Sequence, residues 1–278
     1  MKGFTVLAGA ITAALIAGVA SAAEDPKEGF TIEPKVLDSS ADAGATVALE
    51  YAYQKTFKLK DLSSSDRGNA LPDPTPSRGA VTFSVDGSGT ATADAERNPK
   101  NFLDLSLGLN IDWDPGYETG WGRLLVGGFV KGETDQGFEN EQVVWGARGS
   151  YGQRDLLASN DFLGLDLKYG LVEPGEDKER QKALGVTDLD DYERLDIEAL
   201  YMFRTGWDMV PTIEFNYRLF KELDAPTVIK AVDLDLHQLA TVRFGLGKDL
   251  FVGYSTGKLP FDRKDDQTLE IGFSYKLF

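Results

Sequence analysis

The sequence predicts an all-β chain that folds into a single up-and-down antiparallel transmembrane β-barrel of about 12 strands, with 10 or 8 strands as alternatives. Two observations lead to this fold class. Apolar residues recur at every second position in segment after segment, which is the period of a strand and not of a helix. The chain is also hydrophilic on average, although it contains 16 Phe and ten Tyr. Membrane barrels combine these properties because only alternate residues face lipid.

The alternation is clearest between Leu103 and Trp113, where every second residue is apolar and the residues between are polar or glycine. The same pattern predicts eleven strands, near 45–59, 79–93, 101–113, 121–131, 140–151, 162–171, 192–204, 209–219, 231–246, 249–257 and 267–277. Bacterial barrels usually have an even number of strands, so one strand is missing from this set. It is either a strand around Phe30–Glu33 or the second half of a hairpin that divides 79–93 at Asp86-Gly87.

Counting back from a last strand that ends in the periplasm assigns each connection to a side of the membrane. Segments 205–208 and 247–249 become short periplasmic turns, and the polar segment 172–191 becomes an extracellular loop. Segment 60–78, with its serine run and three prolines, reads as a loop. The short periplasmic turns and the extracellular position of 172–191 both agree with membrane barrels, which have short periplasmic turns and longer extracellular loops.

The last eleven residues resemble the final strand of a Gram-negative outer-membrane β-barrel. Leu269, Ile271, Phe273, Tyr275 and Leu277 share one face, and the chain ends on Phe278, which is one step out of phase with that face. The resemblance implies an outer-membrane location, contact with membrane lipid and lipopolysaccharide, and recognition by the barrel-assembly machinery. The residues expected to carry this assembly signal are Phe273, Tyr275 and Phe278.

The first residues predict an export signal. Met1-Lys2 is positive, Phe4–Val19 is apolar, and Ala20-Ser21-Ala22 has the small-x-small pattern of a cleavage site. The apolar stretch is short for a membrane span, so a retained anchor is the weaker alternative. We therefore expect a cleaved signal peptide at 1–22, export through the periplasm, an N-terminal extension or first strand at 23–44, and the barrel at 45–278. The chain has no Cys, which suits an oxidising periplasm.

Aromatic residues close to the ends of the outward faces predict girdles at the two lipid–water boundaries. The expected girdle residues are Trp113, Tyr151, Tyr169, Phe203 and Tyr275. The opposite phase of the same strands predicts a charged lumen. The residues expected to line it are Asp104, Asp112, Arg123, Arg148, Asp166, Lys168, Asp196, Glu198, Arg204, Glu214, Arg218, Asp233, Asp235, Arg243, Glu270 and Lys276.

Catalysis has one candidate. The single His237 shares a strand face with Asp235, so a carboxylate could orient the imidazole. Outer-membrane phospholipases and lipid A deacylases carry His-x-Ser, however, whereas this chain reads His237-Gln238-Leu239. The acidic segment 172–191 lacks the spacing of a dedicated calcium loop. We expect no catalytic residue, no cofactor and no metal site.

The function expected from these features is a porin-like passage for small hydrophilic solutes. A non-conducting structural or surface-interaction barrel is the alternative, and a hydrolase at the barrel rim is a distant one. The balance of 45 acidic against 29 basic residues disfavours nucleic-acid binding, which rests on basic patches. The sequence does not determine the solute or the oligomeric state.

Overall fold

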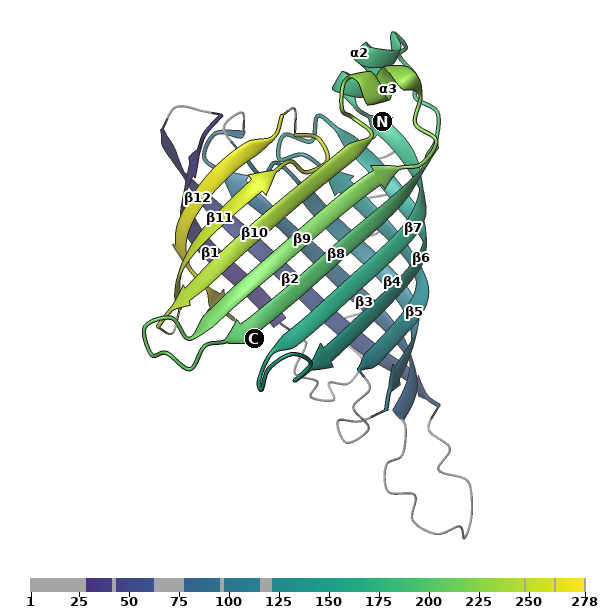
Figure 1. The fold of residues 1–278 in the computed structure, drawn as a ribbon. Helices are drawn as coiled ribbons and strands as arrows, with labels where there is room; N and C mark the ends of the chain where they lie inside the picture. Colours follow the sequence, from purple (N-terminus) through teal and green to yellow (C-terminus); the bar gives the residue numbers. More distant parts are fainter. Residues whose placement is uncertain are drawn as a thin grey trace.

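The structure is a closed, twelve-stranded antiparallel barrel (Figure 1). It is a computed structural model that describes residues 29–41, 44–62, 78–95, 98–115, 122–247, 249–262 and 264–277. Each strand pairs with its neighbours in sequence, and the first strand closes the barrel by pairing with the last. That last strand is interrupted at Ser274, so its final piece, β13, continues β12 alongside β1. The predicted signal peptide and Phe278 lie outside the described residues.

In the part of the chain that the structure describes, two short helices accompany the strands, both in connections at one end of the barrel. The elements in chain order are β1 Gly29–Ser39, β2 Ala45–Asp61, β3 Arg78–Thr92, β4 Leu103–Asp114, β5 Arg123–Thr134, β6 Glu141–Arg154, β7 Phe162–Glu176, α2 Lys178–Leu184, β8 Tyr192–Arg204, β9 Thr212–Glu222, α3 Thr227–Ala231, β10 Leu236–Leu246, β11 Leu250–Gly257, β12 Asp266–Phe273 and β13 Tyr275–Lys276.

The two faces of the wall are inverted relative to a water-soluble protein. In β4 the outward Leu109 and Ile111 are 56% and 58% exposed, whereas the inward Asn110 and Asp112 are 2% and 5% exposed. Successive side chains alternate across a strand, so this pattern presents an apolar outer surface and a polar interior. An apolar surface of this extent around a closed sheet is suited to lipid, since strand pairing continues all the way around the barrel and leaves no open sheet edge.

The missing twelfth strand is β1, Gly29–Ser39. It includes the predicted Phe30–Glu33 and is longer, and it lies within the segment 23–44 that was expected to be an extension or a first strand. The alternative hairpin at Asp86-Gly87 is wrong, because β3 runs unbroken through both residues and pairs with β2 and β4 along that stretch. A strand on each side holds the Asp86-Gly87 peptide extended, and this outweighs the local turn preference of the pair.

The two ends of the barrel differ. We call the end that carries α2 and α3 the helix end, and the end where β1 begins and β13 finishes the terminal end (Figure 1). The turn at 205–211 lies at the terminal end, where β10 ends at Leu246 and β11 begins at Leu250, and the connection between β7 and β8 lies at the helix end. Segment 172–191 is not entirely loop: β7 extends to Glu176, and Asp177 caps α2 by accepting from the N–H of Arg180 at 2.9 Å.

The predicted strand 231–246 begins too early. Residues 227–231 form α3, and β10 starts at Leu236. Asp233 has a φ of 56° and is exposed in the intervening turn, so its assignment as a lumen residue is wrong. Alternation of polar residues at 233, 235 and 237 is typical of a strand, although the first part of this pattern lies in a turn.

Among the described residues, no helix is long and apolar enough to cross a membrane.

Candidate functional site: the lumen of the barrel

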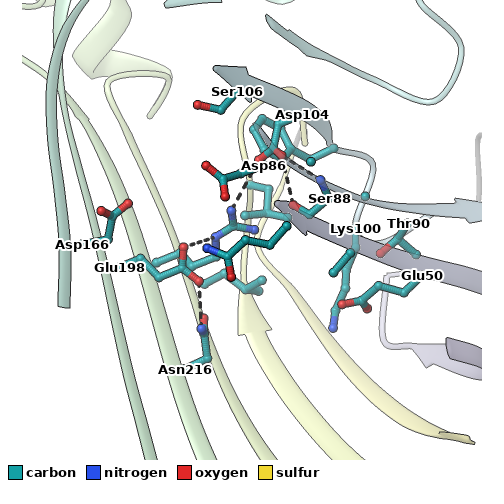
Figure 2. Close-up of a pocket in the computed structure, with 18 of the residues that line it drawn as sticks. Glu50, Asp86, Ser88, Thr90, Lys100, Asp104, Ser106, Asp166, Glu198 and Asn216 are labelled. Carbon is teal, nitrogen blue, oxygen red and sulfur yellow. Dashed lines mark hydrogen bonds and ion pairs between the residues drawn. The ribbon is translucent and has the colours of Figure 1, made fainter. Parts of the chain in front are cut away.

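The lumen contains a central chamber of about 550 Å³. Figure 2 shows its two sides, with Asp166 and Glu198 facing Asp86 and Asp104 across the space. Seven carboxylates and six cationic side chains line the chamber, so the two signs of charge almost balance. They are Glu50, Asp86, Asp104, Asp166, Glu198, Glu214, Glu270, Lys100, Lys131, Arg148, Lys168, Arg218 and Arg243.

Arg218 crosses the lumen. It lies on β9, and its guanidinium is 3.7 Å from the Asp104 carboxylate on β4, five strands away around the barrel. It is also 3.7 Å from Glu198 on the neighbouring β8, which accepts a hydrogen bond from Asn216 at 3.0 Å. The charges of the central chamber therefore pair across the interior as well as along each wall.

A second ion network joins the seam where the barrel closes. Lys35 of β1 contacts Glu50 of β2 and donates to Glu270 of β12 at 2.8 Å. Lys100, in the connection between β3 and β4, reaches the same Glu270 at 3.0 Å. The connection between β3 and β4 is thus tied to the seam by a buried ion pair, across three strands of the barrel.

The third network is the most deeply buried. Arg194 of β8 donates two hydrogen bonds to Glu133 of β5, at 2.6 and 2.9 Å, and two to Asp196, at 2.6 and 2.9 Å. Lys131 contacts Glu133 and lies 3.0 Å from Asp196. Two cations and two carboxylates therefore neutralise one another inside the barrel. Isolated charges of this burial would be costly, whereas a paired set is tolerated.

An apolar layer interrupts the polar interior. Phe102, Phe220, Leu239 and Leu259 form one buried cluster, and Phe261 packs against it. We call these five residues the septum. The Phe102 ring centroid lies 5.8 Å from that of Phe220 and 6.1 Å from that of Phe261. Leu239 and Leu259 also line the central chamber, whereas Phe261 lines a second chamber, so the septum lies between the two.

The second chamber, of about 540 Å³, opens at the helix end. Eight carboxylates and four Lys or Arg side chains line it, which makes it more acidic than the central chamber. Arg180 of α2 forms two hydrogen bonds of 2.7 Å with Glu222 of β9, and its guanidinium lies 4.1 Å from the centre of the Tyr192 ring. These contacts fix α2 on the rim of the chamber.

The predicted lumen residues other than Asp233 occupy five kinds of position. Asp104, Arg148, Asp166, Lys168, Glu198, Glu214, Arg218, Arg243 and Glu270 line the central chamber, and Asp235 lines the helix-end chamber. Asp196 belongs to the buried network, and Asp112 and Arg123 form an ion pair near the terminal end. Arg204 and Lys276 are exposed at the terminal rim.

Several lumen residues were missed. Glu50, Lys131, Glu133 and Arg194 have the inward phase of their strands, so extending the alternation would have found them. Lys100 could not be found in this way, because it lies in a connection that folds inward. The prediction of a charged lumen did not include the apolar residues Phe129, Val144 and Val172, which form a second buried cluster on the inner wall.

His237 and Asp235 both line the helix-end chamber. The Asp235 carboxylate is held by Lys221, its ion-pair partner, rather than aligned on the imidazole. The pair therefore lacks the carboxylate–imidazole alignment that general-base catalysis by histidine uses. Among the described residues, no group of three or more His, Asp or Glu side chains is arranged to hold a metal ion.

The predicted girdle residues lie unevenly on the outer face. Trp113, Tyr151, Phe203 and Tyr275 are close to the terminal end, since each is within three residues of the end of its strand. Tyr169 is 47% exposed and pairs with Leu195 near the start of β8, which is towards the helix end. Four of the five predicted girdle residues therefore lie at the terminal end, and one lies towards the helix end.

No protein-family model and no curated protein match the chain. Among solved structures, it is similar to the translocator domain of the autotransporter NalP from Neisseria meningitidis, with 12% identity, coverage of 99% of this chain and 96% of that one, and a TM-score of 0.31. It is also similar to an outer membrane channel from Pseudomonas putida F1, with 10% identity, 93% and 98% coverage and a TM-score of 0.34. For OccK11 from Pseudomonas aeruginosa the identity is 12%, the coverage 90% and 96%, and the TM-score 0.36. Similarities this low do not assign the chain to any of these groups.

Proposed function

We propose that this protein is a Gram-negative outer-membrane β-barrel through which small hydrophilic solutes pass. The observation that carries the proposal is the succession of two polar chambers, about 550 and 540 Å³, along the inside of a barrel with an apolar outer surface. Each chamber has room for a small hydrated solute, and charged side chains line both. The proposal assigns no enzymatic activity.

In this proposal the apolar outer face contacts outer-membrane lipid and lipopolysaccharide. The chain reaches the membrane by export with residues 1–22 as a cleaved signal peptide, and the barrel-assembly machinery recognises its C-terminal strand. The outward, exposed positions of Phe273 and Tyr275 support this recognition. Because β1 begins and β13 ends at the same end of the barrel, the terminal end is assigned to the periplasm and the helix end to the cell surface.

A non-conducting barrel is the second candidate, and the septum favours it. Phe102, Phe220 and Leu259 are each at most 4% exposed, so the apolar layer leaves no wide opening between the chambers. The transverse Arg218–Asp104 pair narrows the lumen further. The two candidates differ in one measurable property, which is ion conduction.

Planar-bilayer recording of the purified chain tests the proposal, with heat-modifiable gel migration as the check that the barrel is folded. We expect discrete conductance steps with a weak preference for cations, because seven acids face six bases in the central chamber. The acidic helix-end chamber should strengthen the preference at low salt and lose influence as the Debye length shrinks to about 3 Å at 1 M. Reversal potentials in a KCl gradient measure it. Strong anion selectivity would contradict the charge assignment, and silence would favour the non-conducting barrel.

A further inference from the structure

The septum has a fixed half and a half that is not part of the barrel wall. Phe220 belongs to β9 and Leu239 to β10, so both are held by strand pairing. Phe102 precedes β4, and Leu259 and Phe261 lie in the connection between β11 and β12. Segments 98–102 and 258–262 therefore supply three of the five septum side chains. Displacing these two segments would open the layer without breaking any strand pair.

Segment 98–102 is attached to the barrel by a few polar contacts. The Asn98 side chain donates to the Thr90 carbonyl at 2.7 Å and to Gln136 Oε1 at 2.9 Å. Lys100 Nζ lies 3.0 Å from Glu270 Oε2 of β12, three strands from β3 around the barrel. Glu270 also has Lys35 at 2.8 Å, so it keeps a cationic partner when Lys100 leaves. The Lys100–Glu270 ion pair can therefore break without leaving the buried Glu270 carboxylate unpaired.

Asp262 joins the two segments. Its Oδ2 accepts a hydrogen bond from the N–H of Leu259 at 2.8 Å, and the backbone N–H of Asn101 is close enough to the same carboxyl to favour its ionised form. One side chain thus lies against a backbone group from each of the segments that close the lumen. Lys258 fastens the second segment to the wall, with its N–H donating to the Gln238 carbonyl at 2.7 Å.

We propose that segments 98–102 and 258–262 form a gate between the two chambers, with the Lys100–Glu270 ion pair and the Asp262 carboxyl as its latches. The inference rests on the proposed passage of solutes through the lumen. The septum is closed in this structure, and polar chambers lie on both sides of it. Movement of the two segments connects the chambers, while Phe220 and Leu239 stay in the wall.

Single-channel recording of Lys100→Met tests the first latch. A hydrogen bond between charged groups stabilises more than a neutral one, so its loss is expected to raise the ratio of open to closed time by at least about tenfold. The matched control is Lys58→Met, which removes an ion pair with Asp61 at the terminal end, where both side chains are more than half exposed. The control should leave the ratio unchanged.

Cross-linking tests the movement itself, and the absence of Cys from the chain makes it specific. Phe102 and Phe220, whose ring centroids are 5.8 Å apart, are both replaced by Cys, which joins the movable segment to the wall. The reduced double variant should open more often than the natural chain because its septum is smaller. A short bifunctional thiol reagent should abolish these openings if the segment has to move away from β9.

The outcomes separate the gate from the proposed function. If the natural chain conducts, but Lys100→Met and the cross-link leave its open fraction unchanged, the gate is refuted and the passage of solutes stands. If the natural chain, Lys100→Met and the reduced double variant are all silent although folded, both the passage and the gate are refuted. A rise in open fraction with Lys100→Met, together with its loss on cross-linking, supports the gate.

Asp262 predicts a pH dependence of opening. Burial raises the pKa of its carboxyl from 3.8 to about 8, the charge of Asp266 acts in the same direction, and Lys258 opposes both. Between pH 3.8 and about 8, Asp262 is therefore protonated in the closed gate. In the open gate its carboxyl is hydrated and ionised over the same range, so opening releases a proton. Raising the pH across this range favours opening, by up to about tenfold per pH unit, and the effect levels off above pH 8.

Recording the open fraction from pH 5 to 9 measures this effect. Asp262→Asn, which cannot ionise, should remain mostly closed and lose the dependence. This variant separates Asp262 from the other titratable groups of the helix-end chamber, which include His237, Asp235, Glu222 and Lys264. The same slope in Asp262→Asn as in the natural chain would assign the dependence to one of those groups instead.

Discussion

Replacing Glu133 with Leu is expected to lower the free energy of unfolding of the barrel by about 3–5 kcal/mol. The Glu133 side chain is fully buried and accepts hydrogen bonds from Arg194 at 2.6 and 2.9 Å and from Gln142 at 2.6 Å. Its removal leaves Lys131 and Arg194 with Asp196 as their shared carboxylate. An uncompensated buried cation is the reason for the large loss. Urea unfolding of the barrel in lipid measures it.

Lys58→Met is again the control, because it also breaks a Lys–carboxylate pair. Both members of the Lys58–Asp61 pair are more than half exposed, and water screens such pairs so that each contributes about 0–1 kcal/mol. A similar loss in the two variants would show that the Glu133 network is hydrated and not buried.

Replacing Leu107 with Arg is expected to destabilise the barrel by about 2–4 kcal/mol, the cost of a cation facing lipid near the midplane. Leu107 is on the outward face of β4 with Leu105 and Leu109, close to the middle of the strand. Asp104→Asn is the control on the inward face of the same strand. It should cost much less, because Arg218 keeps Glu198 at 3.7 Å. Equal penalties in unfolding experiments would mean that the phase of β4 is wrong.

The period-two pattern determined the wall of this barrel from the sequence alone. Alternation fixes which side of a strand each residue occupies, since a shift of one residue exchanges the two faces. The inward positions of Asp104 and Glu270 and the outward positions of Leu109 and Ile271 follow from this rule. The rule fails where an alternating pattern occurs outside a strand. Asp233 continues the alternation of β10 but lies in a turn.

The tertiary structure alone decided how the lumen is filled. Phe102 and Leu259 come from separate connections and meet only because the barrel closes and both connections fold inward. Arg218 reaches Asp104 across the lumen, and Lys100 reaches Glu270 from a connection three strands away from β12. A periodic sequence specifies the direction of each side chain from its own strand. The distance to a partner on the opposite wall depends on the strand number, on closure and on the path of the loops, and none of these is encoded in the period.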